Sequence, residues 1–159
     1  MNFLAVRACL VSVLLITVSG CSTLRDYPNS FPSNLSVRTT IQSGSVFTGI
    51  RAYLHIYRMK DACEVEYLGT VELNDLATSV GIESGQPTYL KFVFKRTETF
   101  GGAALIEYTT VITPRSEVRY AADVSYVDRT YDVKVRELDR NGAPVREFRR
   151  QGRDCPQET

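Results

Sequence analysis

Apolar and polar residues alternate along most of the chain from residue 37 onward, and a period of two is typical of strands with one buried face. The alternation is clearest over 46–57, 63–73, 90–95, 118–126 and 131–136. The segment 103–113 is apolar on both faces, which suits a central strand or one covered on both sides. We therefore predict antiparallel strands in these segments, with their apolar faces turned toward a shared core.

The two faces of the segment 46–57 differ in chemistry. One face is small or aliphatic and predicts core packing: Val46, Thr48, Ile50, Ala52, Leu54 and Ile56. The other face is aromatic and basic: Phe47, Arg51, Tyr53, His55 and Tyr57. We consider two roles for this second face, a contact surface and the inner face of a further packed layer. In the next segment, the alternation predicts one face made of Cys63, Val65, Tyr67, Val71 and Leu73.

Turn-forming residues separate the predicted strands at 84–87, 101–102, 114–116 and 141–142. Asn141-Gly142 is the strongest of these signals and predicts a hairpin that joins 131–138 to 143–149. About seven or eight strands at this spacing predict an all-β fold, an antiparallel β-sandwich of the immunoglobulin-like or transthyretin-like type. The segment 74–79 is compatible with one short helical turn.

The first twenty residues have the features of a secretory signal peptide. Arg7 precedes a largely apolar run over 9–18, which is too short to span a bilayer as a helix. The motif Val18-Ser19-Gly20-Cys21 follows, and it resembles the lipobox of bacterial lipoprotein precursors, with Val18 in place of the commoner leucine. The resemblance implies a diacylglyceryl thioether on Cys21, cleavage before Cys21 and acylation of the new amino terminus.

The same resemblance also implies where in the cell envelope the protein is located. By analogy with lipoprotein sorting, Ser22 favours the periplasmic face of the outer membrane over retention in the inner membrane. The later residues 67–69 and 85–92, followed by a Tyr-rich strand and a terminal cysteine, are similar to small, uncharacterised proteobacterial lipoproteins. That second resemblance is loose and implies a sandwich fold and a compartment, without an activity.

Three parts are predicted along the chain: a signal peptide at 1–20, the lipidated Cys21 with a flexible tether at 21–36, and a β-sandwich domain at 37–159. The tether is rich in Ser, Asn and Pro and shows no strand or helix period over 22–34. Fully extended, those residues span at most about 43 Å, enough to hold the domain clear of the headgroups. The alternative is that Tyr27 and Phe31 dock on the domain.

Two cysteines, Cys63 and Cys155, fall in the predicted domain, and in an exported protein we expect them to form a disulfide. The alternative, a metal or redox pair, would usually need closer spacing or nearby histidines, and His55 is the only histidine. The bond would close a loop of about 90 residues and contribute roughly 4–5 kcal/mol in the chain-entropy model.

Charge and residue chemistry narrow the function classes. Removing residues 1–20 takes away one of 19 basic residues and none of 18 acidic ones, so the mature chain is neutral. A neutral chain lacks the basic excess of nucleic-acid binders, and we expect no nucleic-acid partner. With one histidine and no phosphate-binding loop, no catalytic constellation stands out, so we expect no enzyme, cofactor or metal.

We therefore expect a membrane-anchored periplasmic lipoprotein that acts as a structural or protein-interaction module, with an envelope protein as its partner. The alternative is a lipoprotein that binds a small ligand or a glycan through Arg51, Tyr53, His55 and Tyr57. The two differ in an observable way. A ligand binder should have a concave pocket lined by aromatic and polar groups, whereas a docking module should have a flat patch or an open sheet edge.

Overall fold

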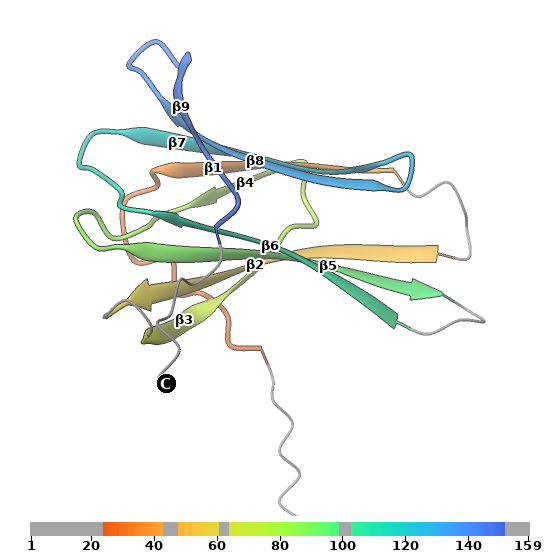
Figure 1. The fold of residues 1–159 in the computed structure, drawn as a ribbon. Coiled ribbons are helices and arrows are strands. Elements are labelled where there is room, and N and C mark those ends of the chain that lie inside the picture. Colours follow the sequence, from red (N-terminus) through yellow and green to blue (C-terminus); the bar gives the residue numbers. More distant parts are fainter. Residues whose placement is uncertain (1–23, 43–47, 61–63, 99–102, 152–159) are drawn as a thin grey trace, which may run out of the picture.

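Two β-sheets pack face to face in the computed structural model, which describes residues 24–42, 48–60, 64–98 and 103–151 (Figure 1). Over these residues there are nine strands: β1 (Leu35–Ile41), β2 (Thr48–Met59), β3 (Val65–Glu72), β4 (Ala77–Val80), β5 (Thr88–Glu98), β6 (Ala103–Ile112), β7 (Arg119–Val127), β8 (Thr130–Leu138) and β9 (Pro144–Phe148). One sheet has the order β4-β1-β7-β8-β9 and the other β3-β2-β5-β6. The predicted all-β sandwich is confirmed.

The core lies between the sheets and contains the alternating apolar residues that the sequence pattern indicated. On β2, Ala52, Leu54 and Ile56 are buried, and the same holds for Leu90, Phe92 and Phe94 on β5 and for Tyr120, Ala122 and Val124 on β7. Each large aliphatic or aromatic side chain removed from water in this way stabilises the fold by about 1.5–3 kcal/mol. The opposite face of β2 points away from the core, and in the described part of the chain no further sheet covers it.

The predicted hairpin at Asn141-Gly142 is also confirmed, because β8 and β9 pair on either side of it. Gly142 has a φ of +86°, a conformation that favours glycine. The Asp139 carboxylate accepts hydrogen bonds from the backbone N–H groups of Asn141 and Ala143, each at 2.8 Å. These bonds satisfy amides that the turn would otherwise leave without a partner.

Three expectations about the strands were wrong. The segment 74–79 is not helical, because Ala77–Val80 forms β4 and pairs with β1. The pairing is not antiparallel throughout, because β1 and β7 run parallel from Leu35 opposite Tyr120 to Ile41 opposite Tyr126. The doubly apolar segment at 103–113 is not a central strand: β6 is at a sheet edge, and Leu105 is 63% exposed.

The face assignment in β3 was wrong at Tyr67 for a local reason. Tyr57 pairs with Tyr67 and Ile56 pairs with Gly69, so Leu68 is an extra residue in a β-bulge. A one-residue insertion reverses the faces on one side of it. Tyr67 therefore shares the outer face of the sheet with Tyr57 and Thr70, rather than the inner face with Val71.

Residues 24–34 pack against the sandwich. This arrangement matches the docking alternative rather than a free tether. Tyr27 is 8% exposed and belongs to the core cluster, whereas Phe31 is 37% exposed. The backbone of this segment pairs with β3: Tyr27 N–H donates to Thr70 O at 2.9 Å, and Thr70 N–H donates to Arg25 O at 2.8 Å. The docked segment therefore adds a short bridge at the β3 edge before β1 begins.

Candidate functional site

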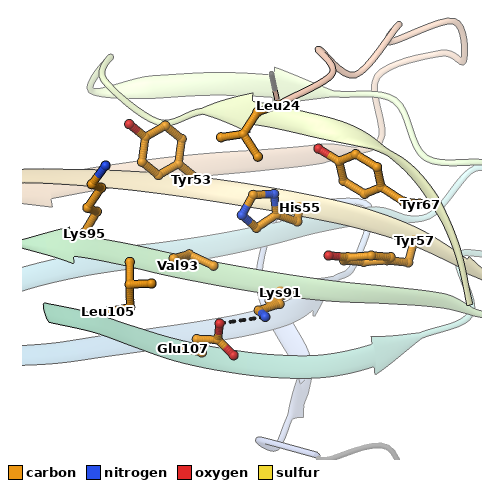
Figure 2. A pocket seen from close by; sticks show the side chains of 10 residues that line it. All are labelled: Leu24, Tyr53, His55, Tyr57, Tyr67, Lys91, Val93, Lys95, Leu105 and Glu107. Atoms are coloured by element: carbon orange, nitrogen blue, oxygen red, sulfur yellow. Dashed lines mark ion pairs between the residues drawn. The ribbon is translucent and has the colours of Figure 1, made fainter. Parts of the chain in front are cut away.

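An open groove runs along the outer face of the β3-β2-β5-β6 sheet, on the side away from the other sheet (Figure 2). It has a volume of about 470 Å³. The residues that line it come from four strands and from the docked segment: Leu24, Tyr53, His55, Tyr57, Tyr67, Lys91, Val93, Lys95, Leu105 and Glu107. Because these positions alternate with core positions along each strand, one buried sheet face fixes the backbone that presents them.

Strand register sets which residues meet in the groove. Tyr53 on β2 pairs with Val93 on β5, and Val93 pairs with Glu107 on β6. One step along each strand on the same face, Lys95 pairs with Leu105. Aromatic residues therefore line the β2 and β3 side, and a mixture of aliphatic and charged residues lines the β5 and β6 side (Figure 2).

Three of the four predicted ligand-binding candidates line the groove: Tyr53, His55 and Tyr57. Arg51 lies on the same strand but is not part of the lining, and its guanidinium is 4.0 Å from the Glu72 carboxylate. Phe47, together with Cys21, Cys63 and Cys155, lies outside the described residues.

The aromatic side chains of the groove form a continuous row. The ring of Tyr53 stacks on His55 with centroids 6.5 Å apart, and His55 is 6.2 Å from Tyr67. Tyr67 in turn lies 5.2 Å from Tyr57 in a tilted arrangement. These separations are within or near the range in which aromatic pairs attract beyond simple burial. The row presents both flat faces and phenol hydroxyls to the groove.

A chain of hydrogen bonds connects His55 to the docked segment. His55 Nδ1 and Thr70 Oγ1 are 2.5 Å apart, as are Thr70 Oγ1 and the Tyr67 hydroxyl oxygen, and Tyr67 donates to Arg25 O at 3.3 Å. A phenol has one hydrogen, so this last bond requires Thr70 to donate to Tyr67 and His55 Nδ1–H to donate to Thr70. This order places a hydrogen on Nδ1, and in the neutral imidazole Nε2 is then an acceptor.

Electrostatics agree with a neutral His55. Burial lowers the pKa of His55, and the nearby Lys91 ammonium lowers that pKa further, while Glu107 opposes both effects. Lys91 and Glu107 form an ion pair at 2.6 Å across β5 and β6. Lys95 has no ion-pair partner among the described residues, so its ammonium is available to an anionic group in the groove. Burial also raises the pKa of Tyr57, which keeps its hydroxyl protonated.

The groove offers the chemistry of binding. It supplies stacking surfaces, aliphatic walls, a neutral ring nitrogen and one available ammonium group. Within the described ranges, no three histidine, cysteine or acidic side chains gather as a metal site would require. No helix in that part of the chain has the length and apolar character needed to cross a membrane.

Seven residues of the groove were not predicted from the sequence, and the sequence signals at these positions differ. Lys91 and Lys95 alternate with Leu90, Phe92 and Phe94, so their outward direction is readable, but the β2–β5 register that brings them beside His55 is not. Tyr67 was hidden by the bulge, and Leu24 reaches the groove only because its segment docks. Val93, Leu105 and Glu107 carried no distinguishing pattern.

Comparison with protein-family models gives no match for this chain, and comparison with curated protein sequences gives none either. We therefore infer a function from the fold and the groove.

Proposed function

We propose that the protein is a lipoprotein of the bacterial cell envelope, anchored through Cys21 on the periplasmic face of the outer membrane, whose groove binds a small amphiphilic ligand. The observation that supports a ligand is the groove itself. It is concave, its volume of about 470 Å³ falls within the usual range for ligand sites, and aromatic and polar groups converge in it. This is the feature expected of a ligand binder rather than of a flat docking module.

The lining indicates the ligand's chemistry. The aromatic row and the aliphatic side chains of Leu24, Val93 and Leu105 favour an apolar or flat body. The available ammonium of Lys95 favours an anionic group at one end. The lining exposes more apolar than polar surface, so an amphiphile with one anionic group fits better than a sugar chain.

A protein partner is a second candidate, and one observation favours it. At the sheet edge, β6 pairs with β5 on one side, and Leu105 and Ile106 are 63% and 38% exposed. The described part of the tail contacts β6 from Glu107 to Thr110: Gln151 N–H donates to Thr109 O at 2.9 Å, Thr110 Oγ1 donates to Arg149 O at 3.0 Å, and the Arg150 guanidinium donates to Glu107 O. Within the described residues, the stretch 103–106 has a neighbour on one side and offers an edge to which an extended peptide could add.

The anchor and the expected disulfide have direct tests. Cys21→Ser should release the protein from the membrane fraction, because two or three acyl chains suffice for stable anchoring and no other anchor is proposed. Continued membrane fractionation of that variant would contradict the lipoprotein assignment. We also propose the Cys63–Cys155 disulfide; alkylation of two thiols without reductant, seen by intact-mass measurement of periplasmic material, would contradict it.

The ligand is tested by native mass spectrometry of the lipoprotein gently extracted from envelopes. We expect one small-molecule adduct per chain on the wild type, with about fivefold lower occupancy in Tyr57→Ala and in Lys95→Gln. Lys134→Gln is the matched control, since Lys134 lies on β8 in the other sheet. An adduct equally retained by all variants would place the ligand elsewhere, and no adduct on any form would leave the β6 edge as the better candidate.

A further inference from the structure

We propose that the groove faces the membrane that holds Cys21 and that its ligand is a phospholipid of that membrane. This inference rests on the proposed anchor and names the ligand class of the proposed site. It follows from where the docked segment ends, how firmly that segment is held and which side chains surround its end.

The docked segment is held at several points along its length. The Tyr27 hydroxyl donates to Gly81 O at 2.7 Å, and Gly81 N–H donates to Asn29 Oδ1 at 2.6 Å. Asn34 makes a reciprocal pair with the Ile82 backbone: its Nδ2 donates to Ile82 O at 2.8 Å, and Ile82 N–H donates to its Oδ1 at 2.9 Å. With the β3 bridge at Thr70, these bonds hold the segment from Arg25 to the start of β1.

Two glycines provide the room for this docking. A Cβ on Gly69 would lie 2.6 Å from the Tyr27 Cα, and a Cβ on Gly81 would lie 1.9 Å from the Phe31 carbonyl oxygen. Both contacts are with backbone atoms, so no side-chain rotation could relieve them. The close approach of the segment at both points depends on the absence of a side chain.

The docked segment begins beside the groove, close to the proposed anchor. Leu24 is part of the groove wall and follows Cys21 by three residues. Three peptide units span at most about 11 Å between Cα atoms, so the Cys21 Cα cannot lie farther than that from the wall. In Figure 1 the docked segment starts on the side of the β3-β2-β5-β6 sheet that faces away from the other sheet. A lipid on Cys21 therefore brings this face to the bilayer.

The side chains on the two outer faces agree with this orientation. Around the groove, Leu24 and Leu105 are 55% and 63% exposed, and three tyrosines, two lysines, a histidine, a valine and a glutamate complete the lining. Tyrosine and lysine suit the interface, because each combines an apolar body with a polar end that stays at headgroup level. The outer faces of β7 and β8 carry the charge pairs Asp123 with Arg136 and Asp132 with Lys134. The groove also holds a charge pair, Lys91 with Glu107, and it differs from this second face in its exposed leucines.

The orientation can be measured with single-tryptophan reporters, because the chain contains no tryptophan. Leu105→Trp reports on the groove, and Val145→Trp is a matched control: Val145 is 59% exposed and lies on β9, an edge strand of the other sheet. The mature lipoprotein is reconstituted in liposomes of phosphatidylethanolamine and phosphatidylglycerol with brominated acyl chains. We expect bromine to quench the Leu105→Trp reporter about threefold more than the control, because an interfacial side chain lies within reach of the acyl region.

A second comparison tests whether docking causes the orientation. Gly81→Ala should displace the docked segment and bring quenching of the Leu105→Trp reporter down toward the control value, while the protein still floats with the liposomes. Gly49→Ala should leave quenching unchanged, since no atom lies within 4 Å of a Cβ placed there. Tyr27→Phe is a milder variant than Gly81→Ala, because it removes only the hydrogen bond to Gly81 O.

The outcomes separate this inference from the proposed function. Equal quenching of the two reporters in a protein whose intact mass includes the acyl chains would overturn the orientation and leave the anchor intact. A chain without that added mass, which also fails to float, would overturn both. For the ligand, native mass spectrometry with added palmitoyl-oleoyl-phosphatidylglycerol should show binding that Lys95→Gln and Tyr57→Ala weaken. A groove adduct that is not a phospholipid, or no binding of this lipid, would overturn the ligand assignment alone.

Discussion

Tyr27 and Gly81, 54 residues apart in the chain, are joined by a hydrogen bond of 2.7 Å from the phenol hydroxyl to the carbonyl oxygen. Burial raises the pKa of the Tyr27 hydroxyl, and the Glu83 carboxylate raises that pKa further, so the hydroxyl remains a donor at neutral pH. Through this bond, a segment beside the proposed anchor belongs to the core of the domain.

Tyr27→Ala should destabilise the domain by about 3 kcal/mol, because it removes a buried aromatic ring and leaves a cavity. Tyr27→Phe should cost about 1–2 kcal/mol, since only the bond to the Gly81 carbonyl is lost. Urea unfolding of the two variants measures both values. Phe31→Ala, at a partly exposed neighbour in the same segment, is the control; a loss as large as that of Tyr27→Ala would show that Tyr27 is not specially important.

Gly69→Ala should lower the free energy of unfolding by about 1–3 kcal/mol. Gly69 has a φ of +151°, and a Cβ there would collide with the Tyr27 backbone. Gly49→Ala should be neutral or slightly stabilising, because it has open space and reduces the entropy of the unfolded chain. Equal stability of the two variants in chemical denaturation would mean that the close approach at Gly69 has no energetic importance.

Asn34→Ala should cost about 1–3 kcal/mol, because the two backbone groups of Ile82 lose their partners together. Asn34→Asp separates the two bonds: a carboxylate can still accept from Ile82 N–H but cannot donate to Ile82 O. We expect the aspartate variant to be as destabilised as the alanine variant or more so at neutral pH. Thermal unfolding of the pair measures this, and an unchanged melting temperature in both would rule out the reciprocal bond.

Stability should fall on acidification through the titration of His55. Its pKa is lowered in the folded state, chiefly by burial, so below about 6.5 the unfolded chain binds more protons than the folded one. Stability contributed by the neutral ring is therefore present above that pH and is lost as pH falls toward the lowered pKa. His55→Gln should flatten the slope of unfolding free energy against pH in that window. An identical slope in the variant would assign the dependence to other groups.

The sandwich itself was largely readable from the sequence, and the reason is visible in β2. Alternation there separates Leu54 and Ile56 from Tyr53 and His55, and burial follows that division. Tyr67 was misassigned because a bulge adds one residue, and nothing local in the sequence marks its place. The edge position of β6 was misread because apolar residues on two faces do not reveal how many neighbours a strand has.

The groove was only partly readable for a related reason. Tyr53, His55 and Tyr57 share one strand, so a period of two brings them to one face. Their partners come from β3, β5, β6 and the docked segment, and which strand neighbours which depends on long-range pairing. The docking of Tyr27 likewise depends on Gly69 and Gly81, residues that the local composition of a Ser- and Pro-rich segment does not indicate.

The docked segment also determines how the domain responds to mechanical force. Tension between the anchor and the sandwich acts first on the bonds at Thr70 and Gly81, and only afterwards on β1. Peeling residues 24–34 would release about 36 Å of chain while both sheets stay intact. The segment is therefore a short extension element between the proposed anchor and the two sheets.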